Sequence, residues 1–169
     1  MNTIEAIRTR RSIRKYTKQA VDKEIVAKLL RAAMSAPSAC NQQPWRFIVI
    51  DRREILDKIP DIHKDAPMCR EAGVAILICA DPSLETCPGY WVQDCAAATM
   101  NLLLAAHDLG LGAVWTGVYP RDQKVNDIRK MFGLPDNIIP FALVPMGYPN
   151  ETIAAEDRYK EDRIKYNHW

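Results

Sequence analysis

The sequence lacks the features that mark membrane, secreted or nucleic-acid-binding proteins. Its 169 residues carry 23 Lys and Arg against 21 Asp and Glu, a formal charge of +2, far from the balance of a nucleic-acid binder. Its least polar stretch, Cys95 to His107, is too short to span a bilayer, and Met1 to Arg14 has no signal-peptide apolar core. We therefore expect a soluble, cytoplasmic protein that binds neither nucleic acid nor membrane, with one domain over residues 1–169.

Residues typical of metal and redox sites are also scarce. The three histidines are scattered, and no two of the five cysteines show C-x-x-C spacing. We expect no metal site and five reduced thiols. Cys79, inside an apolar run, is expected to fill the core, whereas Cys40, in a polar loop, is a candidate reactive thiol. The five cysteines are Cys40, Cys69, Cys79, Cys87 and Cys95.

Apolar periodicity and helix breakers predict helices and strands along the whole chain. The predicted helices are one capped by Thr3 with Ile4 and Ile7 inward, then Asp22 to Ser35, Asp51 to Ile59, Tyr90 to Leu109 and Pro120 to Gly133. The predicted strands are 45–50, 74–80, 113–117 and 141–146. The 74–80 run is apolar throughout, which is typical of a strand covered on both faces. Pro145 indicates an edge position or an irregularity in the last strand.

The longest predicted helix, Tyr90 to Leu109, is apolar nearly all round. Such a helix must be buried on every side, and a domain of this size has difficulty covering it alone. We expect a second subunit to cover its remaining face. The alternative is a central core helix within one chain.

Three segments contain candidate binding residues. Arg10 to Tyr16 packs four cations and Ser12 into seven residues, which is either an anion site or a solvated basic loop. Pro37 to Pro44 is a stiff polar loop directly before a strand, and Gly117 follows another strand, where a backbone can approach a ligand. Both segments also suit ordinary connections. The charged tail after Asn150 ends in aromatic residues and is either a docking arm or a frayed end.

Four motifs, taken in order, resemble the nitroreductase family of flavoproteins. They are Arg10-Arg11-Ser12-Ile13-Arg14, Pro37-Ser38-Ala39-Cys40-Asn41-Gln42-Gln43-Pro44-Trp45, the block from Leu109 to Gly117, and Met146-Gly147-Tyr148-Pro149 followed by a basic tail. The resemblance covers essentially the whole chain and is closest to the family's shorter members. It implies an α+β fold, a mixed sheet flanked by helices, in an intertwined homodimer with FMN at the subunit interface. Residues 150–169 would form an arm that docks on the partner.

The resemblance also implies roles for residues around the flavin. Arg10 and Ser12, with Arg11 nearby, would hold the phosphate, and Arg158 of the tail would return to it. Arg14 would face the pyrimidine edge of the ring, and Thr116 and Gly117 would lie near N5. The loop of the other subunit, through Pro37, Ser38 and Asn41, would line the ring and ribityl chain.

The implied function is an FMN-dependent oxidoreductase. Hydride from NADH or NADPH would reduce the flavin, which then reduces nitroaromatics, quinones or related small acceptors in a ping-pong cycle. No catalytic side chain is required, because the cofactor carries the chemistry. One alternative is a non-catalytic FMN-binding or flavin-handling protein. The other is a basic nucleic-acid module, which the near-neutral charge disfavours.

Overall fold

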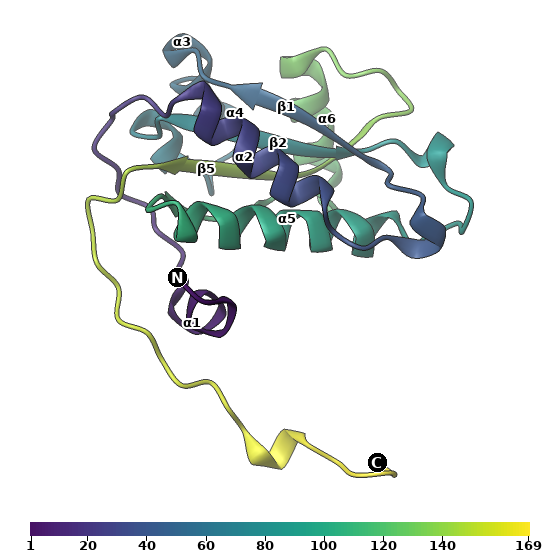
Figure 1. Cartoon of the computed structure of the whole chain (residues 1–169). Helices are drawn as coiled ribbons and strands as arrows, with labels where there is room; N and C mark the ends of the chain where they lie inside the picture. Colours follow the sequence, from purple (N-terminus) through teal and green to yellow (C-terminus); the bar gives the residue numbers. More distant parts are fainter.

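The computed structural model describes residues 1–169 and builds an α+β fold around one five-stranded sheet. The strands are β1 (Trp45–Ile50), β2 (Val74–Ala80), β3 (Gly112–Ala113), β4 (Thr116–Gly117) and β5 (Ile139–Gly147). The helices are α1 (Thr3–Thr9), α2 (Lys23–Met34), α3 (Arg53–Leu56), α4 (Ile59–Ile62), α5 (Trp91–Asp108) and α6 (Asp122–Phe132). The strand order is β1-β2-β5-β3, with β4 also paired to β5, and Figure 1 shows α2 and α5 together on one side.

Strand β2 is buried along all seven residues, as its apolar run predicts. Its side chains alternate between two cores because successive residues of a strand point to opposite faces. Val74, Ile76 and Ile78 pack with α2 and α5. Ala75 and Leu77 pack in the second core, which α3, α4 and α6 cover with Leu56, Ile59 and Ile128. The sheet is therefore the middle layer between two sets of helices.

Of the two alternatives that Pro145 indicated, a sheet edge or an irregularity, the position of β5 excludes the edge. β5 lies between β2 on one side and β3 and β4 on the other. Pro145 pairs with Ala75 of β2, and on its other side it falls between the β3 pairing at Met146 and the β4 pairing at Leu143. A residue without an N–H is tolerated there because the ladder is interrupted. The irregularity that Pro145 indicated is this gap.

The sheet is also more uniform than the mixed sheet expected. All pairs between named strands are antiparallel, and one isolated bridge, between Ser12 and Ala113, is parallel. The 113–117 segment forms two very short strands rather than one, and 51–62 forms two short helices, with Pro60 in the first turn of α4. Helix α6 begins at Asp122, two residues after Pro120, and ends at Gly133 in a left-handed conformation.

Helices α1 and α5 leave apolar surface uncovered within one chain. Ile4 and Ile7 of α1 are 65% and 49% exposed rather than inward, and Ala6 is the buried residue of this helix. Asn2, not Thr3, caps α1 by accepting the Glu5 N–H. One face of α5 is only half-buried, although it was expected to be covered on every side; it carries Ala96, Ala97, Met100, Leu104 and Ala105. No helix is both long and apolar enough to cross a membrane.

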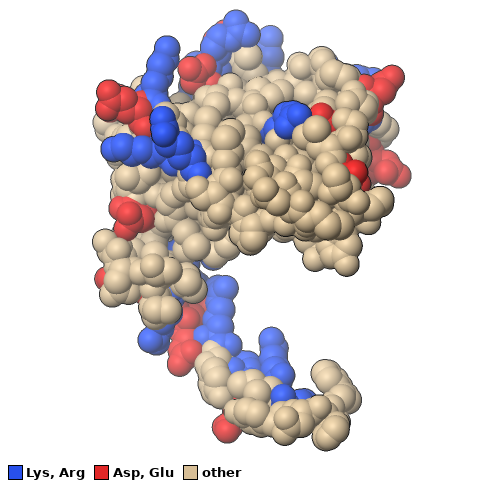
Figure 2. Space-filling view, turned by 45° about the vertical axis from the view of Figure 1, so that its right-hand side comes forward, with Lys and Arg blue, Asp and Glu red and all other residues tan.

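The last twenty residues leave the body as an extended arm with one short turn, Glu161–Arg163 (Figure 1). Its base is fixed by the Asn150 N–H, which donates to Lys15 O at 2.9 Å. Beyond Glu151 every residue is exposed, including Tyr166 and Trp169 at the end. Figure 2 shows side chains of both charge signs along the arm.

His63, after α4, is fully buried and has no hydrogen-bond partner on either ring nitrogen. Burial, with Lys124 nearby, lowers the pKa of this imidazole below its ordinary value of 6.5. The folded protein therefore holds His63 neutral, while the unfolded chain binds a proton as the pH falls below about 6.5. Acidification must cost stability at this position.

We expect His63→Leu to lose part of this acid sensitivity. Thermal unfolding is measured between pH 7.5 and 5.5. As the pH falls below 6.5, the free energy of unfolding of the variant should rise relative to that of the wild type, by up to about 1.4 kcal/mol per pH unit. His168→Leu, in the exposed arm, is the control and should follow the wild-type profile. Parallel profiles for His63→Leu and wild type would contradict the assignment.

Candidate functional site

The basic segment after α1 runs extended beside β3. The Ile13 N–H donates to Ala113 O at 3.0 Å, and Ser12 forms a bridge with Ala113. Gly112 allows this close approach, since a Cβ there would lie 2.6 Å from Cγ2 of Ile13. Tyr16 fixes the far end of the segment: its hydroxyl lies 2.6 Å from Ile13 O and 3.0 Å from Pro145 O, two carbonyl oxygens that share its one proton.

This segment and the arm enclose a cavity of about 290 Å³ that gathers five of the predicted phosphate and flavin residues. The lining residues are Arg10, Arg11, Ser12, Arg14, Ile153 and Arg158. No acidic side chain lines it. Arg158 lies beside the N-terminal motif in the fold, although it follows Arg14 by 144 residues in the sequence.

The charges around this cavity are only partly compensated. Arg11, with a side chain 12% exposed, pairs with Glu156 at 3.2 Å, and Arg158 contacts the same carboxylate at 3.6 Å. The hydrogen bond and charge of Arg11, aided by Arg158, lower the pKa of the Glu156 carboxyl. Burial, followed by repulsion from Arg158 and Arg11, lowers the pKa of Arg10, whose Nε is buried without a partner. Of the four guanidinium groups, only those of Arg11 and Arg158 pair with a carboxylate, and an anion would relieve the repulsion that Arg10 meets from both.

Glu151 joins the arm to the basic segment, a role that the sequence did not predict. Its carboxylate accepts the Arg14 N–H at 2.6 Å and the Lys15 N–H at 3.2 Å. These bonds join the root of the arm to the basic segment and leave the Arg14 guanidinium free, apart from a 3.4 Å contact with Ser12 O.

The predicted loop lies at the start of α5, away from this cavity. Asp94 in the first turn of α5 is 4% exposed and accepts the Ala39 N–H at 2.9 Å and the Gln42 Nε2–H at 2.7 Å. Gln42 Oε1 accepts the N–H groups of Thr86 and Cys87, both at 3.0 Å. Pro37 and Asn41 are exposed and Ser38 is half-buried. Asp94 and Gln42 therefore hold the loop, and a lone carboxylate on an apolar helix was the signal that could have revealed them.

The loop also corrects the expectation that all five cysteines are reduced. Cys40 forms a disulfide with Cys87, with Cα atoms 6.3 Å apart, while Cys69, Cys79 and Cys95 are free and buried. The two partners are 47 residues apart in the sequence. Only the folded arrangement of the two loops beside α5 brings them together, so spacing gave no sign of the bond. Cys79 fills the core as predicted.

Thr116 and Gly117 form β4, which follows α5 along the chain and pairs with β5. The Thr116 hydroxyl donates to Leu143 O at 2.8 Å, which fixes this segment on β5. Gly117 is exposed, and a Cβ there would meet only Tyr119 O, at 4.0 Å. Nothing in the single chain therefore requires glycine here. Exposed Trp115 and Tyr119 flank the segment, and Tyr119 packs edge-on against Trp91 with ring centroids 4.8 Å apart.

Apart from Thr116 and Gly117 in β4, the structure holds the predicted site residues in two groups at opposite ends of α5. The basic segment follows α1, whose last residue, Thr9, hydrogen-bonds through Oγ1 to His107 Nε2 in the last turn of α5 at 2.8 Å, and the loop contacts Asp94 in the first turn. Thirteen residues of helix separate these contacts, roughly 20 Å at 1.5 Å per residue. One chain does not bring the two groups together.

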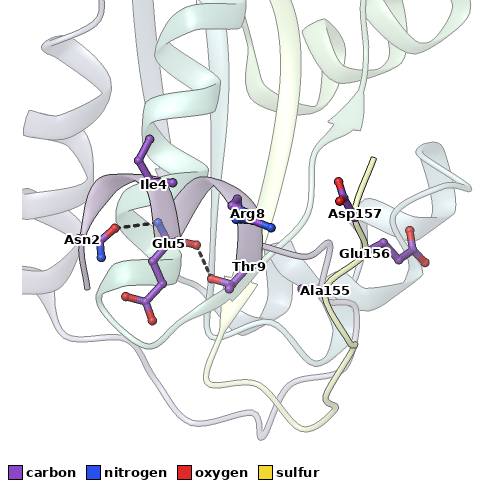
Figure 3. Close-up of a pocket in the computed structure, with 8 residues that line it drawn as sticks. All are labelled: Asn2, Ile4, Glu5, Arg8, Thr9, Ala155, Glu156 and Asp157. Atoms are coloured by element: carbon purple, nitrogen blue, oxygen red, sulfur yellow. Dashed lines mark hydrogen bonds between the residues drawn. The ribbon is translucent and has the colours of Figure 1, made fainter. Parts of the chain in front are cut away.

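The largest cavity, about 510 Å³, lies between α1 and the arm and contains none of the predicted residues. Figure 3 shows Glu5, Arg8, Glu156 and Asp157 around it, with α1 closing one side. Its lining is mainly polar and its outer wall is the arm, so its shape depends on where the arm lies. No group of His, Cys, Asp or Glu in the chain could hold a metal ion.

The chain is an α+β protein with an arginine-lined cavity between its N-terminal segment and its C-terminal arm. The family model described as "Nitroreductase family" matches residues 7–68 and 63–148. The chain belongs to the nitroreductase family.

Three relatives illustrate the similarity. A Methanothermobacter thermautotrophicus protein, provisionally named NADH dehydrogenase/NAD(P)H nitroreductase, is 52% identical over all of this chain and 88% of its own length. The FMN-dependent nitroreductase of Clostridium difficile R20291 is 30% identical with a TM-score of 0.91, covering 99% of this chain and 100% of its own. A provisionally assigned nitroreductase of Desulfovibrio desulfuricans, solved in complex with FMN, is 33% identical with a TM-score of 0.85, covering 100% and 99%.

We expect Gly112→Ala to destabilise the protein, because the new methyl group would overlap Ile13. Overpacking of this kind costs about 1–3 kcal/mol, which for a chain of this size lowers the melting temperature by roughly 2–4 °C per kcal/mol. Gly117→Ala is the matched control for stability, since its Cβ has open space, and its melting temperature should not fall. Equal melting temperatures for Gly112→Ala and wild type would contradict the tight packing of the basic segment on β3.

Proposed function

We propose that this protein is an FMN-dependent NAD(P)H oxidoreductase that reduces nitroaromatics, quinones or related small acceptors. The observation that carries the proposal is the pocket of Arg10, Arg11, Ser12, Arg14 and Arg158. Membership of the nitroreductase family and the FMN named for two of the relatives support it.

The pocket residues fit the phosphate of FMN. The unpartnered Arg10 Nε and the excess of guanidinium groups suit a dianion, which arginine binds through paired, charge-assisted hydrogen bonds. Arg10 and Ser12 would hold the phosphate, with Arg11 nearby and Arg158 closing the pocket from the arm. Glu156, also in the arm, pairs with Arg11 and Arg158 and would hold both side chains in position until the anion binds.

The working unit that we propose is a homodimer with a site at each end of the interface. The two groups of site residues lie at opposite ends of α5, so an antiparallel second chain would place its Pro37, Ser38 and Asn41 beside the first chain's basic segment. The half-buried apolar face of α5 and the exposed Ile4 and Ile7 support such an interface. Residues 1–169 would act as one domain, with 150–169 docking on the partner.

When bound, FMN supplies the redox chemistry, accepting hydride from NADH or NADPH and passing electrons to the acceptor in a ping-pong cycle. The chain's residues position and tune it. Exposed Arg14 would stabilise negative charge on the pyrimidine edge of the reduced ring. The Thr116–Gly117 backbone, fixed by the Thr116 hydroxyl on Leu143, would lie near N5. No side chain needs to act as a nucleophile.

The purified protein should be yellow, and anaerobic addition of NADH or NADPH should bleach the visible flavin bands. Parallel titrations with the two nucleotides identify the donor. A yellow protein that neither nucleotide bleaches would favour the alternative, a non-catalytic FMN-binding or flavin-handling protein. A colourless protein that takes up no added FMN would overturn both.

Replacing Arg10 and Ser12 together with Ala should give a colourless, less stable protein. Hydrogen bonds to charged groups are worth about 1.5–3 kcal/mol each, so FMN affinity should fall by about 100-fold or more, measured by quenching of flavin fluorescence. Arg8→Ala is the control, because Arg8 is exposed on α1 and does not line the arginine cavity. Full flavin occupancy in the double variant would show the phosphate assignment to be wrong.

A further inference from the structure

We propose that the Cys40–Cys87 disulfide is a reversible thiol–disulfide exchange site for dithiol reductants, and that it sets the rigidity of the 38–43 loop. Cys40 is exposed and Cys87 half-buried, so an attacking thiolate has access to the bond. The predicted cytoplasmic location strengthens the inference, because disulfides in that compartment are usually transient, catalytic or redox-sensing.

The loop that carries Cys40 is held in an uncommon backbone conformation. Cys40, Asn41 and Gln43 have φ values of 50°, 53° and 48°, the left-handed region that residues with a Cβ rarely adopt. Such geometry persists only where the surroundings enforce it. Three constraints do so here: the Asp94 carboxylate, the Gln42 bridge to residues 86 and 87, and the disulfide.

The disulfide is the one covalent constraint of the three, and the only one that chemistry can switch. Asp94 and Gln42 act on Ala39 and on the 86–87 backbone, while the disulfide joins Cys40 directly to Cys87. Cutting it removes the link of Cys40 to residue 87 and leaves this part of the loop to weaker bonds within the loop, from the Asn41 N–H to Ser38 O at 3.1 Å and from the Gln43 N–H to Ser38 Oγ at 3.0 Å. The folded body remains, since the two core clusters do not include either cysteine.

The exchange is balanced without any further reactant. A thiolate of the reductant attacks Sγ of the more exposed Cys40, the S–S bond breaks, and Cys87 leaves as a thiolate that takes a proton from water. Cys87 stays close and would re-form the bond, so a second thiol on the reductant must release Cys40 from the mixed disulfide. The reductant is oxidised by two electrons to its own disulfide, and the cysteine pair gains two electrons and two protons.

The other three cysteines do not take part. Cys69, Cys79 and Cys95 are at most 1% exposed, and burial raises the pKa of each thiol to about 12. They are neither accessible to a reductant nor ionised at neutral pH. The exchange is therefore confined to one pair, which gives an internal control in every labelling experiment.

The first test is reduction of the full-length native protein. Dithiothreitol at neutral pH, followed by iodoacetamide and peptide mass analysis, should label Cys40 and Cys87 and leave the three buried cysteines unlabelled. In a parallel sample, removal of the reductant in air before alkylation should re-form the disulfide and leave Cys40 and Cys87 unlabelled. A bond that resists dithiothreitol until the protein is denatured would overturn the proposal, as would two free thiols in protein purified and handled under oxidising conditions.

The second test measures the loop itself without any cofactor. On reduction, amide hydrogen exchange at residues 40–43 should accelerate by about tenfold or more, with the β2 amides unchanged. The variant Cys40→Ser/Cys87→Ser should show the fast rates with or without dithiothreitol. Equal protection of the loop in both redox states would overturn the proposed link to rigidity.

A consequence for the cofactor rests on the proposed function, because Ser38 and Asn41 would line the flavin. Loss of a preorganised loop should weaken FMN binding by about threefold to tenfold, in reduced wild type and in the double-serine variant alike. If the oxidised wild type binds no FMN, the proposed function is contradicted. If it binds FMN with the same affinity before and after reduction, only the link between the disulfide and FMN binding is contradicted.

Discussion

The length of α5 is the constraint on which the rest of this structure depends. Asp94 in its first turn holds the 37–44 loop, and His107 in its last turn contacts Thr9, which ends α1 just before the basic segment. A helix packed along the sheet cannot shorten or fold back, so the loop and the basic segment stay roughly 20 Å apart. A second chain could supply its own 37–44 loop beside this chain's basic segment. That arrangement would account for the partly uncovered face of α5, the exposed isoleucines of α1 and the long arm.

Electrostatics gives the arginine-lined cavity a second property. Glu156 pairs with Arg11 and Arg158 only, while burial and repulsion from these two arginines disfavour the charged form of Arg10. An anion bound there would compensate this cost and so link binding to stability, because a ligand that binds only the folded state stabilises it increasingly as its concentration exceeds the Kd. Glu156 limits the cost meanwhile, and its exposed position makes it easy to displace.

Much of the fold could be predicted from the sequence because its signals are local. The bounds of β1 and β2 and the left-handed end of α6 follow from apolar runs and breakers. The basic motif could be picked out because its residues are contiguous, and the resemblance singled out Arg158, which lines the same cavity. The Cys40–Cys87 bond and the roles of Asp94 and Gln42 depend on loops that meet only in the folded state. Ile4 and Ile7 show the same limit, since a pattern reports which face of a helix is apolar but not whether this chain covers it.

Strand β2 divides its side chains between two cores, one on each face of the sheet. A change in the register of this strand therefore affects both cores at once. Inserting or deleting one residue within Val74–Ala80 would move every side chain on one side of that point to the opposite face of the sheet, so both cores would be disrupted together. Replacements must therefore be compensated on the correct side of the sheet. The loops that carry the site face no such restriction, and a lineage can vary its chemistry there while the strand stays fixed.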